Sequence, residues 1–287
     1  MVADTPAVGR AILCKLVSAL LIAVMYGLIK SLGQSYPVGQ VLFARNLFAL
    51  LPICLLIQLL GQWHDLRPRN LRAHAYRCSF GIASQFLCFA AVGLLPLATA
   101  TALTYTAPLF IGLFAMLFLR ESVSRGRWLS LLVGFAGVYV IVLPDFDGVE
   151  PGMLVALLGA MATAGALLSI RSMTGDQQGT TIALYFSLFG TVVGAASLGF
   201  EWIMPAPEDW PVLVGIGLVG GVAQVLLTQA YQLAPASAVA PFEYSTLVFA
   251  SLIGYLCWAD VPAPNELLGM LIIVGATLVL TPKPKHR

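Results

Sequence analysis

The chain has 287 residues, of which 59% are hydrophobic and 10% are charged, with a formal net charge of +2 and a mean hydropathy of +0.91. A water-soluble globule could hardly cover its surface with so few polar residues. The composition therefore excludes an ordinary soluble protein and predicts an integral membrane protein. We expect the lipid bilayer as its surroundings and no nucleic-acid partner.

The apolar sequence is divided into ten segments by breaks rich in Pro, Gly and charge. A helix that crosses about 30 Å of hydrocarbon needs roughly 20 mostly apolar residues. In chain order the predicted spans are residues 11–32, 38–60, 74–95, 98–119, 127–144, 152–171, 179–202, 211–233, 238–258 and 266–282. The predicted fold class is an all-α integral membrane protein with ten transmembrane helices.

The charges of the loops give an independent test of this division, because Lys and Arg stay on the cytoplasmic side. With the N-terminus in the cytoplasm, thirteen of the fifteen basic residues fall at cytoplasmic helix ends and loops: Arg10, Lys15, Arg67, Arg69, Arg72, Arg77, Arg120, Arg125, Arg127, Arg171, Lys283, Lys285 and Arg287. The opposite loops carry only carboxylates: Asp145, Asp147, Glu150, Glu201, Glu208, Asp209, Asp260 and Glu266. Both termini are therefore predicted to be cytoplasmic. The first apolar stretch is too long for a cleavable signal peptide, so it is expected to stay as a helix.

An internal repeat relates the two halves of the chain. Sliding the sequence against itself by 139 residues aligns matching residue types: Pro96 with Pro235, Tyr105 with Tyr244, and Glu121 with Asp260. Since five is an odd number of helices, the second half must enter the membrane from the opposite side. We predict two five-helix repeats of inverted topology, residues 1–146 and 147–287, an architecture of secondary transporters that work by alternating access.

Several stretches carry a resemblance to a known family: "LIKSLGQSYPVGQVLFARNLFALLP" from Leu28, "LPLATATALTYTAPLF" from Leu95, and "LFLRESVSRGRWLSLLVGFAGVYVIVLP" up to Pro144. They resemble the EamA-type members of the drug/metabolite transporter superfamily. The resemblance implies ten helices in inverted halves, no cofactor, and transport of small metabolites, among them amino acids exported across the bacterial inner membrane. The ten-helix aromatic amino acid exporter group is the closest likeness, by fold and length rather than by a substrate motif. Nucleotide sugars and drugs stay open as substrates.

Two ionisable side chains are predicted to lie well inside the spans, Arg45 in the second and Glu243 in the ninth. Charges inside a membrane are expensive and usually mark a substrate or ion pathway. Arg45 could clamp a substrate carboxylate or brace helix ends. Glu243 could carry protons, anchor an ammonium group or form a structural hydrogen bond. Lys30, near the outer end of the first span, could contact substrate or extend to the headgroups.

Tyrosine and glutamine side chains supply the other candidates for lining a substrate cavity, since tyrosine combines a flat apolar face with one hydroxyl. They are Tyr26, Gln85, Tyr105, Gln224, Tyr231 and Tyr244. Helix packing and the interfacial aromatic belt are the alternatives for each tyrosine. Pro108 and Pro241 can bend the fourth and ninth spans and act as hinges. The GxxxG spacing at residues 190–194 and 217–221 predicts close helix packing; a monomer is expected to suffice, and a dimer stays open.

Several function classes lack their defining residues. The sequence contains no G-x-x-x-x-G-K-[ST] pattern, so ATP is not expected to drive transport directly, and energy would come from the substrate's own gradient or from an ion, with proton coupling as one possibility. No span supplies a Ser/His pair, a paired Asp or a metal-ligand set, so neither an enzyme nor a metal site is expected. The five cysteines show no metal-ligand spacing and are interpreted as buried hydrophobic residues. A passive channel or membrane scaffold is the remaining alternative.

Overall fold

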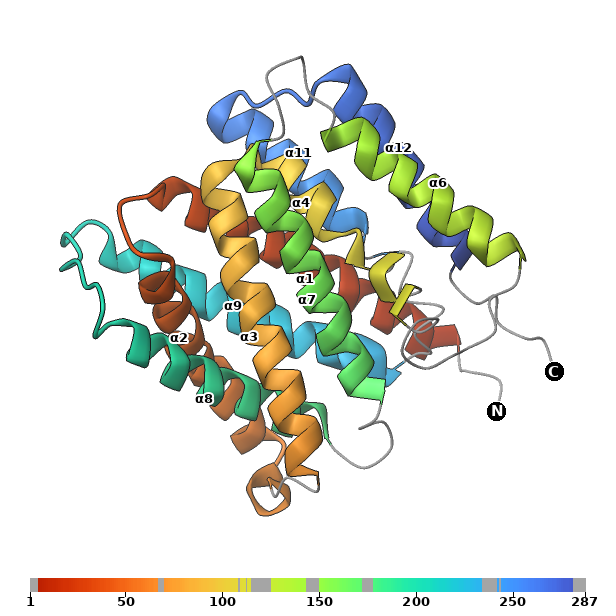
Figure 1. Ribbon diagram of the computed structural model, residues 1–287. Helices are drawn as coiled ribbons and strands as arrows, with labels where there is room; N and C mark the ends of the chain where they lie inside the picture. The colour runs from red at the N-terminus through yellow and green to blue at the C-terminus, as the bar shows by residue number, and fades with distance from the viewer. Residues whose placement is uncertain are drawn as a thin grey trace.

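The computed structural model describes residues 5–66, 70–107, 109–111, 113–114, 125–142, 150–171, 178–233, 242 and 244–280. Over these residues the chain forms ten α-helices, one short 3-10 helix and no strand, which confirms the predicted all-α fold (Figure 1). The elements are α1 (Thr5–Leu32), α2 (Val38–Leu59), η1 (Gln62–Asp65), α3 (Leu71–Leu94), α4 (Leu97–Thr104), α6 (Arg125–Val142), α7 (Pro151–Arg171), α8 (Gly179–Ser197), α9 (Trp210–Leu233), α11 (Ser245–Trp258) and α12 (Pro264–Leu280).

The outer surface of the helix bundle is apolar. Leu59, Leu256 and Leu271 are 70–74% exposed, and many other large aliphatic side chains are also exposed. Soluble proteins rarely expose contiguous apolar surface on this scale, so this surface faces lipid. Five segments are long and apolar enough to cross a membrane, and shorter apolar helices accompany them. The five are Val8–Leu32, Val38–Leu59, Leu71–Leu94, Gly179–Ser197 and Trp210–Leu227.

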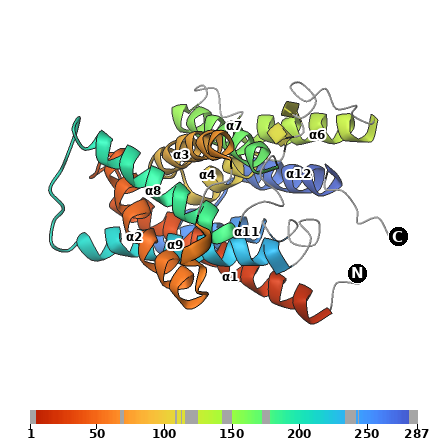
Figure 2. The same cartoon turned by 90° about the horizontal axis from the view of Figure 1, so that it is seen from below.

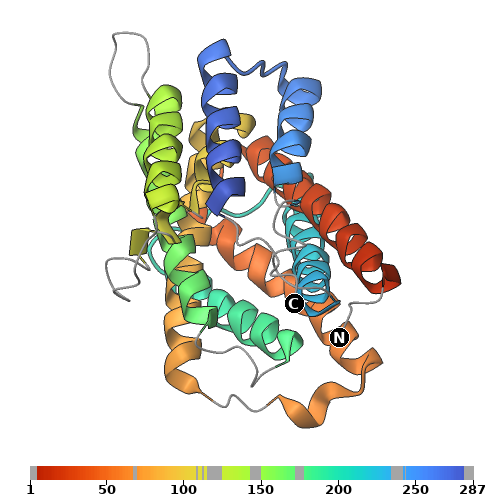
Figure 3. The same ribbon diagram turned by 90° about the vertical axis from the view of Figure 1, so that its right-hand side faces the viewer.

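Helix packing follows the two-fold relation that an inverted repeat requires. Helix α1 packs on α9 as α7 packs on α3, α1 packs on α11 as α7 packs on α4, and α2 packs on α9 as α8 packs on α3. Corresponding helices also meet directly: α2 with α8, α4 with α11, and α6 with α12. The α6–α12 pair lies side by side at one edge of the molecule (Figures 2 and 3). The two sets of five helices are therefore interlocked rather than separate bundles.

The alternation of helix directions gives the bundle two faces. Helix α1 begins on one side, here called the Arg10 face, where α2 ends and α3 begins. Helix α1 ends on the opposite side, here called the Lys30 face, where α2 begins, α3 ends and α4 begins.

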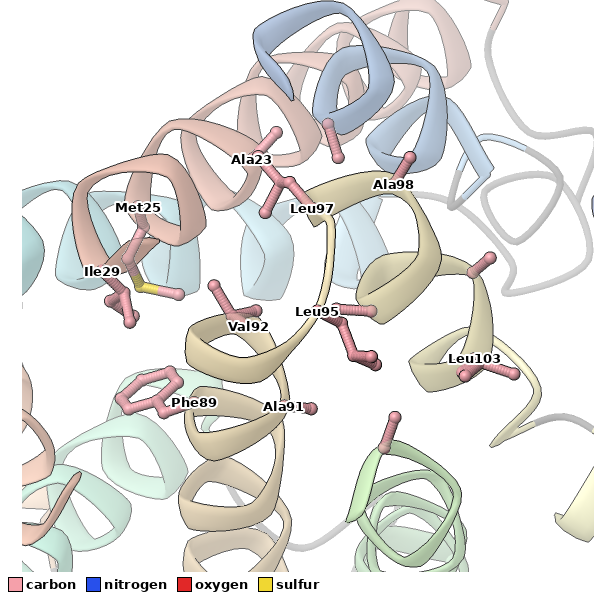
Figure 4. Packing of buried hydrophobic residues seen from close by; sticks show 14 of the residues in the cluster. Ala23, Met25, Ile29, Phe89, Ala91, Val92, Leu95, Leu97, Ala98 and Leu103 are labelled. Atoms are coloured by element: carbon pink, nitrogen blue, oxygen red, sulfur yellow. The ribbon is translucent and has the colours of Figure 1, made fainter. Parts of the chain in front are cut away.

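The chain reverses from α3 to α4 on the Lys30 face at a proline. Pro96 has no N–H group and cannot continue α3, but its φ of −53° suits the residue that precedes the first turn of α4. Leu97, which follows it, is fully buried. In Figure 4, Phe89 near the end of α3 lies opposite Met25 and Ile29 of α1. This apolar junction holds α1, α3 and α4 together beside the polar cluster described below.

Glycines allow α8 and α9 to pack directly against α2. A Cβ atom at Gly194 would lie 2.6 Å from the Cα of Phe43, and one at Gly221 would lie 2.8 Å from the Cα of Ala49. Side chains cannot occupy space that close to a neighbouring backbone, so the predicted role of these glycines in packing is confirmed. Of the two other glycines with GxxxG spacing, Gly217 also faces backbone, since a Cβ atom there would lie 2.9 Å from the backbone oxygen of Ala44, whereas one at Gly190 would lie 2.5 Å from Cγ of the Asn46 side chain.

The substitution Gly221→Ala should destabilise the protein by about 1–3 kcal/mol, because the added methyl group forces α9 away from α2. The matched control is Gly275→Ala, where a Cβ atom meets nothing within 4 Å. The control should be neutral or slightly stabilising, since alanine favours a helix over glycine. Thermal unfolding midpoints of the purified variants measure both effects, and equal midpoints would contradict the packing role of Gly221.

Candidate functional site

Polar side chains from three helices reach one level near the middle of the bundle. Tyr26 lies six residues before the end of α1, Arg45 lies seven residues after the start of α2, and Gln85 lies nine residues before the end of α3. At 1.5 Å per residue these positions are about 9 to 14 Å below the Lys30 face. The hydrocarbon core is about 30 Å thick, so the three residues lie near its mid-plane.

Arg45 is the centre of this cluster. Its side chain is 4% exposed, and its Nη1 donates a hydrogen bond to Oδ1 of Asn46 at 3.1 Å. The Gln85 amide lies against the guanidinium: with its oxygen turned towards Arg45, it accepts hydrogen bonds from Nε at 2.8 Å and from Nη1 at 3.3 Å. Gly220 of α9 leaves room for the group, because a Cβ atom there would lie 3.2 Å from Nε of Arg45.

The cluster has more N–H donors than acceptors. A guanidinium carries five donors and no acceptor, and each amide carries two donors and one oxygen. The Gln85 oxygen can serve either Arg45 or Nδ2 of Asn46, which lies 2.9 Å from the other amide position. Asn46 also donates to the backbone oxygen of Leu42 at 2.9 Å. In the part of the chain that the structure describes, no carboxylate forms an ion pair with Arg45, so a bound carboxylate would supply the missing acceptors.

Two symmetry-related tyrosines meet beside this cluster. The ring centroids of Tyr105 and Tyr244 are 6.4 Å apart, with 53° between the ring planes. Tyr105 ends α4 and Tyr244 precedes the first turn of α11. A contact between equivalent positions of two repeats lies on the axis that relates them, so this pair marks the centre of the fold. Tyr26, whose ring packs edge-on against Phe89, is close enough to Tyr105 and Arg45 to interact electrostatically with both.

Lys30 lies apart from this cluster, two residues before the end of α1, at the face that is named after it. Gln224 lies in α9, one turn beyond Gly220. Tyr231 belongs to α9 by its backbone, but its side chain lies outside the described residues. The other predicted residues that lie outside the described part of the chain are Pro108, Pro241 and Glu243. Their roles stay predictions.

Two basic residues were placed at cytoplasmic helix ends by the sequence analysis, and the structure corrects both. Lys15 is 2% exposed within α1, which begins several residues earlier than predicted. Arg77 lies six residues inside α3, because this helix also begins early: the side chain of Asn70 accepts a hydrogen bond from the Ala73 N–H at 3.1 Å and caps it. Recognising Asn70 as the capping residue would have placed Arg77 six residues inside the helix instead of three. Asn46 and Phe186 had no such signal in the sequence.

Polar contacts join the two halves of the chain at the Lys30 face. Lys30 of α1 forms an ion pair with Asp260, just after α11, and its Nζ lies 5.2 Å from the ring of Trp258. Tyr36 donates a hydrogen bond to Asp209 at 2.5 Å, which raises the pKa of the Tyr36 hydroxyl above its ordinary value of 10, so the hydroxyl remains protonated at neutral pH.

Two further contacts complete this set, here called the Lys30 latch. Gln40 exchanges hydrogen bonds with the backbone of Ile203, at 2.8 and 3.1 Å. Thr99, at the start of α4, donates to Glu266 of α12 at 2.7 Å. Each of the four contacts joins a residue of α1, α2, α4 or the α1–α2 loop to one from the second five helices or their loops. These four contacts therefore hold the two sets of helices together at this face.

The Arg10 face has a small pocket between α2, α8 and α9. Its volume is about 60 Å³, and its lining combines aliphatic side chains of α2 with polar groups near the start of α8 and the end of α9. The polar lining residues are Gln62, Gln178, Thr180 and Gln229. Ala183, which lies one helical turn from Phe186, is part of the lining. Because α8 begins and α9 ends on the Arg10 face, the pocket lies on the side of the central cluster opposite the Lys30 latch.

Comparison with known proteins identifies the class to which this fold belongs. The EamA-like transporter family matches residues 9–143 and again residues 150–281, so the chain belongs to this family of membrane transporters. A solved structure, described only as a crystal structure of a protein, is 18% identical and covers 95% of this chain and 97% of its own, with a TM-score of 0.68. That likeness concerns the fold alone.

The relatives differ in what they transport. The pseudopaline exporter CntI of Pseudomonas aeruginosa is 30% identical over 94% of this chain and 95% of its own length. The riboflavin transporter of Vibrio cholerae is 29% identical over 86% and 83%, and the S-adenosylmethionine uptake transporter of Rickettsia bellii is 28% identical over 64% of each chain. These names do not confirm the predicted likeness to aromatic amino acid exporters.

Breaking the ion pair of the Lys30 latch should open this face more often. Leu97 is fully buried there, so a cysteine at this position, in a chain whose five native cysteines are replaced, reports on opening. The substitution Asp260→Asn should increase its rate of modification by a membrane-impermeant thiol reagent about fivefold, as expected for the loss of about 1 kcal/mol. Exchanging the charges, Lys30→Asp with Asp260→Lys, should restore the slow rate. An unchanged rate in Asp260→Asn would contradict the latch.

Proposed function

We propose that the chain is a secondary transporter that exports amino acids or related small metabolites bearing a carboxylate across the bacterial inner membrane. The observation that carries this proposal is the buried Arg45, whose neighbours among the described residues supply too few acceptors for its N–H groups. A guanidinium binds a carboxylate through two parallel hydrogen bonds, and this geometry selects a planar anion. The tyrosines beside it provide flat apolar faces for the rest of the substrate.

The second candidate function is transport of a different class of metabolite by the same fold. The names of the relatives support this alternative. Proteins that share a fold can carry unrelated substrates, and relatives about 30% identical are named for pseudopaline, riboflavin and S-adenosylmethionine. Nucleotide sugars and drugs belong to this alternative. The donor-rich environment of Arg45 favours a carboxylate or another anion over a cation.

Sidedness follows from the charges. The Arg10 face carries the basic helix ends and loops, so we assign it and both termini to the cytoplasm. The Lys30 latch then closes the external side, while the pocket of the Arg10 face lies on the cytoplasmic side. This arrangement suits loading from the cytoplasm. In the alternate state the external side would be open and the cytoplasmic side closed. Residues 1–146 would rock against residues 147–287 about the Tyr105–Tyr244 contact, with Pro108 and Pro241 as hinges. A single chain would be the working unit.

Counterflow in liposomes tests the proposed function. The purified protein is reconstituted into liposomes preloaded with one unlabelled compound from a panel of amino acids, nucleotide sugars and cationic drugs. Uptake of the labelled form of the same compound is then measured. Counterflow with an amino acid is the expected result. Counterflow only with a nucleotide sugar or a drug would overturn the amino acid assignment and support the second candidate.

Replacing Arg45 should discriminate between a substrate ligand and a structural arginine. Charge-assisted hydrogen bonds contribute about 1.5–3 kcal/mol, so Arg45→Ala should weaken binding of transported amino acids at least about tenfold. Binding of the corresponding amino acid amides, which lack the carboxylate, should change little. Arg72→Ala is the matched control, because Arg72 is exposed on α3. An equal loss of binding affinity for the acids and for their amides would show that Arg45 has a structural role instead.

We further propose that protons drive transport through Glu243. This carboxylate is predicted to lie within the ninth span, where a low dielectric favours its neutral form and exposure to either side changes its proton occupancy. Glu243→Gln should therefore flatten the pH dependence of flux, while the exposed Glu150→Gln serves as the control. An unchanged pH profile in Glu243→Gln would exclude this role.

A further inference from the structure

The side chain of Arg77 extends into the bundle. A Cβ atom on Gly81 would lie 2.2 Å from Nη1 of Arg77 and 2.7 Å from the ring of Phe186. Nη1 therefore occupies the space that a side chain at this position would need. Gly81 is one turn further along α3, away from the Arg10 face. The guanidinium therefore points towards the mid-plane, and the absence of a side chain at Gly81 makes this conformation possible.

This direction is unfavourable for an arginine that serves only the membrane surface. Arg77 lies six residues from the start of α3, or about 9 Å from the Arg10 face, within reach of the headgroups for so long a side chain. Helical side chains also lean towards the start of their helix, which is the Arg10 face here. Arg77 does the opposite. Its Nε is buried and has no hydrogen-bond partner in the described part of the chain.

Arg77 and Arg45 share one aromatic ring. The guanidinium carbon of Arg77 lies 4.7 Å from the ring centroid of Phe186, and that of Arg45 lies 5.8 Å from it. The ring attracts both cations through its negative face. On α3, Arg77, Gly81 and Gln85 follow one another at intervals of four residues and so form one stripe. The stripe ends at Gln85, which contacts Arg45.

Two guanidinium groups are thus held together in a low-dielectric region. In the described part of the chain neither forms an ion pair with a carboxylate. Like charges repel each other strongly in a low dielectric, and the cation–π contacts do not remove their charge. A ligand with two anionic groups would neutralise both and would supply acceptors to the donors of Arg45 and to Nε of Arg77.

We infer that Arg77 forms a second anion-binding position and that the transported substrate carries two carboxylates, one bound by Arg45 and the other by Arg77. This inference rests on the proposed function and narrows it from carboxylate-bearing metabolites to dicarboxylates. Phe186 provides the shared surface along which the ligand lies. Arg77, nearer the Arg10 face, is the first of the two positions that a ligand entering from that face would meet.

Ligand-induced stabilisation of the purified full chain tests this inference. The probes are succinate, glutarate and adipate, each compared with its monoamide, which keeps the length but has one carboxylate. The readout is the concentration that gives half of the maximal rise in thermal unfolding midpoint. For the wild-type chain, at least one dicarboxylate should act at a concentration at least about tenfold lower than its monoamide, as expected for one lost charge-assisted contact.

Variants of Arg77 test whether this residue causes the preference for the dicarboxylate over its monoamide. Arg77→Gln should remove the preference for the dicarboxylate, so that acid and monoamide act at similar concentrations, whereas the exposed Arg72→Gln should keep the preference. If Arg77→Gln does not fold, Arg77→Lys keeps the charge but lacks the planar fork and should lose part of the preference. A preference that survives in the Arg77 variant, or equal responses of wild type to acid and monoamide, would overturn the inference. Binding of monocarboxylates without a preference would leave the proposed function intact, while no response to any carboxylate would overturn both.

Discussion

The arrangement of the centre of this transporter depends on a buried guanidinium. An unsatisfied buried donor costs about 1–3 kcal/mol, and more when it is charged, so Arg45 must be surrounded by groups that accept hydrogen bonds or face its charge. Asn46 and Gln85 supply oxygens, Phe186 supplies an aromatic face, and Gly220 supplies the space. These groups come from four helices. The requirement to solvate one cation in the membrane therefore fixes how α2, α3, α8 and α9 are placed.

The inverted repeat is the basis for the proposed access to this centre from two sides. Equivalent helices pack in equivalent ways, and the Tyr105–Tyr244 contact lies on the axis that relates the halves. The two faces nevertheless differ in chemistry. The described contacts of the Lys30 face include an ion pair and hydrogen bonds between the halves, and the Arg10 face has a pocket lined partly by amides. In the proposed cycle the symmetry of the backbone would allow two exchangeable states, and the unequal side chains would favour the one closed on the Lys30 face.

Much of the fold follows from the sequence, because hydropathy, loop charge and the repeat all report the same ten helices. The depth of Arg45 and the pairing of Tyr105 with Tyr244 were also predictable, from residue spacing and from the repeat. Lys15 and Arg77 lie deeper in their helices than predicted, because α1 starts six residues and α3 three residues earlier than hydropathy suggests. Phe186 has no distinguishing pattern: its role depends on which helix packs opposite it, and that is set by tertiary packing.

The central claim is that Arg45 holds a carboxylate of the substrate near the membrane mid-plane. A structure of the chain determined with a transported carboxylate substrate bound tests this claim most directly. The account predicts a carboxylate oxygen within hydrogen-bonding distance of the Arg45 guanidinium, with the Gln85 amide free to turn its oxygen to Asn46. A substrate carboxylate held by other residues, with Arg45 still bonded only to Asn46 and Gln85, would contradict it.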